Sequence, residues 1–278
     1  MARPLFSTQS DVSLTYSGRK IVGATLTVSV LALIARAAEP HLFLWLNGLT
    51  HTLPDSLWVG LSLLGNGWFL AALLLPLVVR FPQVFFAALI ATPLTAIASR
   101  SLKALFSLPR PPSVLDASTF HLIGEIHLNG SMPSGHSITA FAIAIAITQV
   151  AASPLSRHAG KCLLLAGLIA LSRIGMGVHW PEDVLVGAAI GGLCGLLSAH
   201  LASRHFPSNW LSLPETRFGE SGLHTKRVAL LWGLIGLVIA AGLFWLDEDR
   251  GMLPEFRYAF ACLALLTSLN LLRRIFKR

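Results

Sequence analysis

The sequence predicts an all-α fold, a polytopic membrane helix bundle, and two observations support this. Charged residues make up only 12% of the 278 residues and hydrophobic residues 54%, whereas a soluble domain carries about 25% charged residues. The hydrophobic residues are also gathered into long runs, and a helix of about 20 such residues crosses the hydrocarbon layer of a bilayer. We therefore expect most of the chain to lie within lipid.

Eight apolar runs are candidate membrane spans. We place them near Arg19–Ala37, Leu57–Val79, Val84–Leu102, Ser137–Ala152, Cys162–Val178, Val184–Ser203, Val228–Leu246 and Tyr258–Leu272. The second run is the clearest, while the fourth, fifth and eighth are short for the thickness of a bilayer. Pro76 and Pro93 lie inside or near the ends of spans, where proline is tolerated because neighbouring groups satisfy the freed carbonyls.

Polar and turn-forming residues mark the ends of these runs. The first run follows a polar leader and has no small-residue cleavage site of the kind that ends a signal peptide, so we expect a retained helix. The third run ends in a stretch stiffened by Pro109, Pro111 and Pro112. The sixth run follows Trp180-Pro181, and proline suits the first turn of a helix.

Lysine and arginine gather at one end of the predicted bundle. With the N-terminus inside, fourteen of the 21 fall in cytoplasmic stretches. These are Arg3, Arg19, Lys20, Arg80, Arg157, Lys161, Arg204, Arg217, Lys226, Arg227, Arg273, Arg274, Lys277 and Arg278. The opposite side holds the acidic run Asp247-Glu248-Asp249. The positive-inside rule then predicts that both termini are cytoplasmic, and it explains the net charge of +8 without a nucleic-acid partner.

Three polar clusters interrupt the apolar runs, and the span count brings all three to the outer face. The first cluster holds Lys103 and Arg110, seven residues apart at the end of the third span. Long cationic side chains can simply reach the headgroups from a helix end, but charges near lipid are usually retained for function. Arginine offers a bidentate fork to phosphate oxygens and lysine a compact charge, so we favour phosphate coordination.

The second cluster is Pro133-Ser134-Gly135-His136, directly before the fourth span. Gly135 permits close backbone approach, and the amides at the start of a helix attract anions. Ser134 is a suitable helix cap and can also donate its hydroxyl to an anion. His136 would face the same anion and could protonate a leaving oxygen.

The third cluster is Ser172-Arg173, His179 and Asp183, around the start of the sixth span. His179 and Asp183 are four residues apart, so they share a face if this turn is helical. A carboxylate that accepts from one ring nitrogen leaves the other nitrogen a lone pair for attack. A capping aspartate beside an incidental interfacial histidine is the plainer interpretation of the same pair.

The spacing and order of the three clusters resemble the three motifs of the type 2 phosphatidic acid phosphatase (PAP2) superfamily. The resemblance extends from about Leu57 to Ser203 and implies that His179 is a nucleophile forming a phosphohistidine. It also implies that Asp183 orients His179 and that His136 is the general acid. Five residues would hold the phosphoryl oxygens: Lys103, Arg110, Ser134, Gly135 and Arg173.

The resemblance further implies an architecture and a location. Residues 1–203 would form a six-helix phosphatase core, and residues 204–278 a cytoplasmic loop and a transmembrane helix hairpin that departs from the family pattern. No metal or other cofactor is expected. We expect an integral protein of a bacterial inner (cytoplasmic) membrane, with its active site on the outer, periplasmic face and a membrane lipid phosphate as substrate.

Other functions remain open at the level of sequence. A phosphotransferase would pass the phosphoryl group to a lipid acceptor instead of water. A transporter would fit eight spans, but transporters place polar groups near the bilayer midplane. A zinc hydrolase could use His136, His179 and Asp183, although the three nearby cations would repel a divalent ion. A serine hydrolase is disfavoured because Ser134 lacks a nucleophile-elbow sequence.

The substrate and the outer histidines are less well defined. Phosphatidic acid, phosphatidylglycerol phosphate, polyprenyl diphosphate and lipid A all present a phosphate at an apolar boundary, and a fold does not choose among them. The sequence does not indicate an oligomeric state. His121 and His127 lie in the long loop between the first two clusters, where they could line a substrate entrance or simply sit at the interface.

Overall fold

A computed structural model describes residues 16–79, 81–124, 126–150, 156–205, 223–245 and 254–276. Regular structure within these ranges is helical, and no strand occurs in them. The elements are α1 (Tyr16–Ala37), α2 (His41–Thr50), α3 (Asp55–Leu63), α4 (Gly67–Leu74), η1 (Leu75–Val79), α5 (Pro82–Phe106), α6 (Pro111–Val114), α7 (Gly135–Gln149), η2 (Ser156–His158), α8 (Ala159–Gly175), α9 (Pro181–His205), α11 (Leu223–Trp245) and α12 (Pro254–Phe276). The predicted all-α membrane bundle is confirmed.

Five of the described helices are long and apolar enough to cross a membrane, and a bent pair can supply a sixth span. The five are α1, α5, α8 with the preceding η2, α9 and α11. α7 is apolar but shorter, with 15 residues. α12 is helical over the predicted eighth span but is not among these five.

The second span differs from the prediction of one continuous helix over Leu57–Val79. The chain instead forms α3 and α4, bent by 72° relative to each other. Gly65, Asn66 and Gly67 lie at the bend, and the Asn66 side chain caps α4 by accepting from the Trp68 N–H at 2.9 Å. This capping bond satisfies a helix-end donor that a continuous helix would not expose, so the local sequence favours a break over a continuous span.

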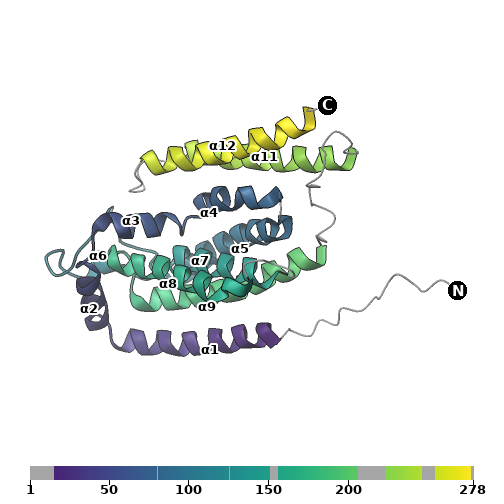
Figure 1. Cartoon of the computed structure of the whole chain (residues 1–278). Helices are drawn as coiled ribbons and strands as arrows, with labels where there is room; N and C mark the ends of the chain where they lie inside the picture. The colour runs from purple at the N-terminus through teal and green to yellow at the C-terminus, as the bar shows by residue number, and fades with distance from the viewer. Residues whose placement is uncertain are drawn as a thin grey trace.

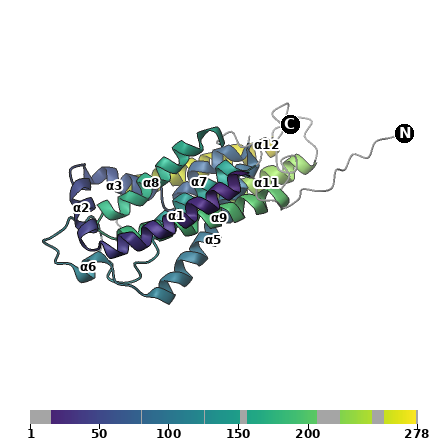
Figure 2. The same ribbon diagram turned by 90° about the horizontal axis from the view of Figure 1, so that it is seen from below.

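The helices form layers around α7. Figure 1 shows α1 along one side of the bundle, α7, α8 and α9 in the middle, and the α11–α12 hairpin along the opposite side. α1 packs on α9, and the hairpin packs on α4. Viewed from below, α1 crosses in front of α9 (Figure 2). The largest apolar core lies between α4, α5, α7 and the hairpin, where Trp232 of α11 contacts Phe85 and Phe86 edge to face.

The two ends of the bundle carry different elements. The start of α1 and the end of α12 lie at one end, on the right of Figure 1, while α2, α3 and α6 lie at the other. All three polar clusters lie at the end that carries α2, α3 and α6. Several residues used to predict the orientation lie outside the described ranges, namely Arg3, Arg80, Arg217, Lys277, Arg278 and the run Asp247-Glu248-Asp249.

A stripe of glycines on α9 lets α7 approach closely. An added Cβ at Gly187 would lie 2.8 Å from the Ser134 carbonyl oxygen, one at Gly191 2.5 Å from that of Ile138, and one at Gly195 2.5 Å from that of Ala142. Small residues four apart allow membrane helices to pack backbone to backbone, where dispersion and not hydrophobic burial drives association. The stripe therefore sets the distance between the starts of α7 and α9.

We expect Gly191→Ala to destabilise the bundle by about 1–3 kcal/mol, the usual effect of overpacking a tight contact. The backbone oxygen of Ile138 cannot rotate away from the new methyl group. Gly167→Ala on α8 is the matched control, because a Cβ there meets nothing within 4 Å. The stability of the two variants is measured by thermal unfolding in detergent. Equal midpoints for Gly191→Ala and Gly167→Ala would contradict the close approach of α7 to α9.

Candidate functional site

A cavity of about 420 Å³ opens at the end of the bundle that carries the polar clusters. Six of the eight predicted site residues line it, and they come from four separate segments. These residues are Lys103, Arg110, Gly135, His136, Arg173 and His179. Ser134 and Asp183 are fully buried behind this lining. Lining residues up to 76 positions apart in the sequence thus converge on one space.

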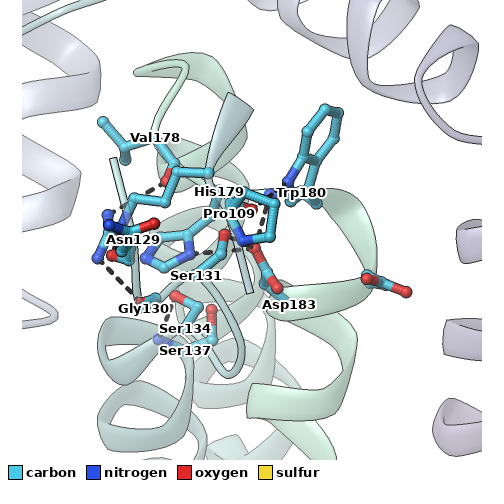
Figure 3. A network of polar contacts seen from close by, with 12 residues as sticks. Pro109, Asn129, Gly130, Ser131, Ser134, Ser137, Val178, His179, Trp180 and Asp183 are labelled. Atoms are coloured by element: carbon cyan, nitrogen blue, oxygen red, sulfur yellow. Dashed lines mark hydrogen bonds and ion pairs between the residues drawn. The ribbon is translucent and has the colours of Figure 1, made fainter. Parts of the chain in front are cut away.

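His179 and Asp183 form a buried pair on one side of the cavity (Figure 3). The Nδ1 atom of His179 lies 3.3 Å from Oδ2 of Asp183, and their side chains are 2% and 0% exposed. With Nδ1 turned towards the carboxylate, the other ring nitrogen, Nε2, is left for the cavity. The pair therefore has the orientation expected of a nucleophilic or basic imidazole, and the carboxylate favours the tautomer with its proton on Nδ1.

The Asp183 carboxylate is held in place by donors other than His179. Ser131 donates its hydroxyl to Oδ2 at 2.5 Å, and the Trp180 backbone N–H donates to the same oxygen at 2.9 Å. The Ser134 N–H bonds to the Asp183 carbonyl at 3.0 Å. Ser131 was not singled out from the sequence, since a lone serine before the Pro133 turn carries no pattern. Its 0% exposure and its bond to Asp183 show its place in the site.

The environment of His179 favours its neutral form. His179 lies in the turn between α8 and α9, and burial lowers its pKa well below the usual value, with further lowering by Arg110, Arg173 and Lys103. A neutral imidazole carries a lone pair on Nε2 at neutral pH. The cations that would bind an anion thus also keep the histidine unprotonated.

Arg110 has a larger structural role than the sequence suggested. Its guanidinium donates to three backbone carbonyls, those of Asn129 at 3.1 Å, Val178 at 3.2 Å and Gly130 at 3.3 Å. Burial lowers the pKa of Arg110, but the ordinary value for arginine is so high that the group stays charged. Arg110 therefore joins the loop before α7 to the turn that carries His179 while it lines the cavity.

Arg173 reaches the cavity from the last turns of α8. Its Nη1 group donates to the Ser62 hydroxyl of α3 and lies 3.4 Å from the sulfur of Met176. Ser62 lies near the end of α3, just before the bend in the second span, so that bend places a partner beside the buried guanidinium. The sequence prediction missed Ser62 because it treated this segment as ordinary apolar span.

The start of α7 supplies the second cluster. Ser134 is the helix cap, accepting from the Ser137 N–H at 3.5 Å, and its hydroxyl does not line the cavity. A Cβ at Gly135 would lie 3.0 Å from the Ser99 hydroxyl, and one at Gly65 2.7 Å from the His136 ring. Gly65, also missed from the sequence, therefore leaves room for His136 at the cavity wall.

The two outer histidines differ in position. His127 lines the cavity, whereas His121 pairs with Asp55 at 2.9 Å. His136, His179 and Asp183 are not among the groups of described side chains that converge closely enough to share a metal ion. As placed here, the ligand atoms of these three residues do not converge as those of a zinc site do.

Comparison with known proteins gives matches to membrane phosphatases. A profile of the PAP2 superfamily matches residues 81–207. The crystal structure of Aquifex aeolicus LpxE matches with a TM-score of 0.52 and 32% identity, covering 58% of this chain and 93% of that one. The crystal structure of a Bacillus subtilis transmembrane PAP2-type phosphatidylglycerolphosphate phosphatase covers 66% and 98%, at 20% identity and a TM-score of 0.48.

A curated relative also matches over a short region. It is the decaprenylphosphoryl-5-phosphoribose phosphatase of Mycobacterium tuberculosis, 37% identical over 67 residues, which is 24% of this chain. The match spans about a third (34%) of that relative's length. The profile includes the region that holds the three clusters, and with the Aquifex match it shows that this chain belongs to the PAP2 superfamily.

Proposed function

We propose that the protein is a phosphatase that removes a phosphate from a membrane lipid phosphate or diphosphate. The observation that carries the proposal is the buried His179–Asp183 pair facing a cavity that is also lined by Lys103, Arg110 and Arg173. The pair supplies a nucleophile, and the cations supply a binding site for the phosphoryl group. The curated Mycobacterium relative is named for a substrate with a phosphate on a decaprenyl-linked sugar, which accords with a lipid phosphate here.

The proposed reaction has two steps. Nε2 of His179 attacks phosphorus, the bond to the leaving oxygen breaks, and His136 gives that oxygen a proton. Asp183 stabilises the imidazolium part of the phosphohistidine. Water, losing a proton to His136, then attacks phosphorus and releases phosphate together with neutral His179. Lys103, Arg110, Arg173 and the amide of Gly135 stabilise the charge that develops on the oxygens.

The cavity is suited to a substrate with an apolar portion. Besides the cations, it is lined by apolar side chains from α3, the loop before α7 and the turn before α9, namely Val59, Leu63, Ile123, Met176 and Val178. A phosphate on a lipid lies at the boundary between water and hydrocarbon, which is where these segments begin or end. A panel of phosphatidic acid, phosphatidylglycerol phosphate, polyprenyl diphosphate and lipid A, with and without an acceptor lipid, separates the substrates and distinguishes hydrolysis from phosphotransfer.

We also propose an orientation and a division of the chain. The end of the bundle opposite the cavity carries Arg19 and Lys20 at the start of α1, Arg204 at the end of α9, and Lys226 and Arg227 at the start of α11. This favours a cytoplasmic location for that end and an outer location for the cavity, in a bacterial inner membrane. Residues 1–203 act as the phosphatase core, and the hairpin within 204–278 supports that core without supplying a described cavity residue.

Asp183→Asn tests the role of the pair. The neutral amide removes the negative charge that would stabilise the imidazolium part of the phosphohistidine. We expect the rate to fall on the order of 10³–10⁴-fold, as in other His–Asp pairs, with little change in thermal unfolding. The rate is measured as phosphate release by the purified protein, with His179→Ala as the blank. A near-normal rate for either variant would overturn the assignment.

Chelation tests the metal-independent mechanism. We expect EDTA-treated enzyme to keep its activity and vanadate to inhibit it, because vanadate adopts the five-coordinate geometry of phosphoryl transfer and the fixed cations replace the metal ions of other phosphatases. The rate on the best substrate of the panel is the readout. Activity that is abolished by EDTA and restored by zinc or magnesium would favour a metal hydrolase.

Trp232→Ala tests the supporting role of the hairpin. The indole is 0% exposed between Phe85 and Phe86, so its removal should cost about 3–5 kcal/mol of stability. Turnover of a small soluble phosphate ester by the folded protein should stay close to normal. Leu231→Ala, at a side chain 42% exposed, is the control. Loss of turnover at temperatures where Trp232→Ala remains folded would show that the hairpin takes part in catalysis.

A further inference from the structure

Three side chains suited to binding a metal ion converge outside the cavity, at the same end of the bundle. They are His51, Asp55 and His121, and their ligand atoms all lie within 4.8 Å of one another. The His121 Nε2 and Asp55 Oδ1 atoms are 2.9 Å apart, and the rings of His51 and His121 lie with centroids 4.0 Å apart and a tilt of 31°. None of the three has a part in the proposed hydrolysis.

The three ligands come from separate segments that the fold holds together. His51 follows the last residue of α2, Asp55 begins α3, and His121 lies in the loop between α6 and α7. The corner between α2 and α3 is closed by the Trp58 indole, which donates to the Thr50 carbonyl at 2.9 Å. The positions of His51 and Asp55 are therefore set by contacts that involve neither side chain.

Asn47 fixes the third segment against this corner. Its side chain accepts from the His121 N–H at 2.8 Å and donates to the His121 carbonyl at 2.9 Å. The same amide donates to the Ile174 carbonyl at 3.0 Å, and Asn47 is only 1% exposed. A buried side chain thus holds the backbone of His121 at a set place beside α2, so the cluster exists before any ion binds.

We propose that His51, Asp55 and His121 bind a divalent cation of the zinc class. Two imidazoles and one carboxylate are a donor set typical of zinc, with ligand bonds of about 2.0–2.2 Å and a fourth position open to water. Imidazole favours zinc and its transition-metal neighbours over magnesium or calcium, which prefer oxygen ligands. His51 and Asp55 are exposed, so an ion can enter from water and their side chains can adjust to its geometry.

Binding would tie the α2–α3 corner to a wall of the cavity. The loop that carries His121 continues to Ile123 and Gly124, which line the cavity, and Ile123 donates to the Met176 carbonyl at 3.1 Å. An ion held by one ligand on this loop and two on the corner restrains the loop from its outer side. The bound ion would therefore restrain the loop that forms part of the cavity wall, and it supplies no group to the reaction.

The test measures binding and not turnover, so its result does not depend on the proposed phosphatase activity. The full chain, purified without a polyhistidine tag and stripped with EDTA, is titrated with Co²⁺ and Zn²⁺ while absorption and heat are followed. We expect one ion per chain and, for His51→Gln, Asp55→Asn or His121→Gln, affinity more than about 100-fold lower, since loss of an outer-shell partner alone costs 10–100-fold. His41→Gln, elsewhere on α2, is the matched control.

Two further readouts make the result decisive. Zn²⁺ should raise the midpoint of thermal unfolding of the wild-type chain and of His41→Gln, and leave that of His51→Gln unchanged. If His121→Gln does not fold, His51→Gln still tests the site, because the His51 side chain is exposed. The His179→Ala chain should still bind one ion. Absence of binding by the wild type, or equal binding by all the variants, overturns the site. Loss of binding in His179→Ala would instead place the ion in the cavity and overturn it as well.

Discussion

The close contact between α7 and α9 is the constraint on which the rest of the site depends. Both helices begin at the same end of the bundle, one with Ser134 and Gly135 and the other with Asp183 in its first turn. Three glycines on α9 remove the side chains that would separate the two backbones. The Ser134 N–H can therefore reach the Asp183 carbonyl at 3.0 Å, and the second and third polar clusters become parts of one site.

The same contact governs the electrostatics. Because the start of α7 is held beside the turn before α9, Lys103, Arg110 and Arg173 share one partly enclosed space with His136 and His179. Three cations close together repel one another, and burial adds to the cost. Arg110 offsets part of it through three backbone carbonyls, and Arg173 through Ser62. An anionic ligand would relieve the remaining repulsion, so the arrangement favours an anion, as the proposed phosphatase requires.

The bend in the second span links the outer part of the molecule to this space. It brings Ser62 to Arg173 and places Gly65 where His136 needs room. α3, on the outer side of the bend, also leads back to Asp55 and the corner with α2. The bend and α3 therefore contribute both to the cavity and to the α2–α3 corner that carries Asp55. On the other side of the bend, α4 packs against the C-terminal hairpin.

Most of the helices and most of the site residues could be predicted from local patterns, because membrane spans and family motifs are local in sequence. Seven of the eight apolar runs are helices close to their predicted bounds, since a membrane-spanning helix needs a continuous apolar stretch. The second run is two helices, and α2 was not predicted. The motif spacing predicted the family, and the i, i+4 relation of His179 and Asp183 predicted that they share a face.

Other features arise only when distant segments meet. Ser131, Ser62 and Gly65 carry no motif, and their roles come from what lies opposite them in the fold. The split of Leu57–Val79 into two helices depends on a cap at Asn66 and on the space that His136 takes. Likewise His51, Asp55 and His121 become neighbours only because Asn47 binds the His121 backbone. Hydropathy and spacing describe one segment at a time, whereas close packing and hydrogen bonding between segments are properties of the folded chain.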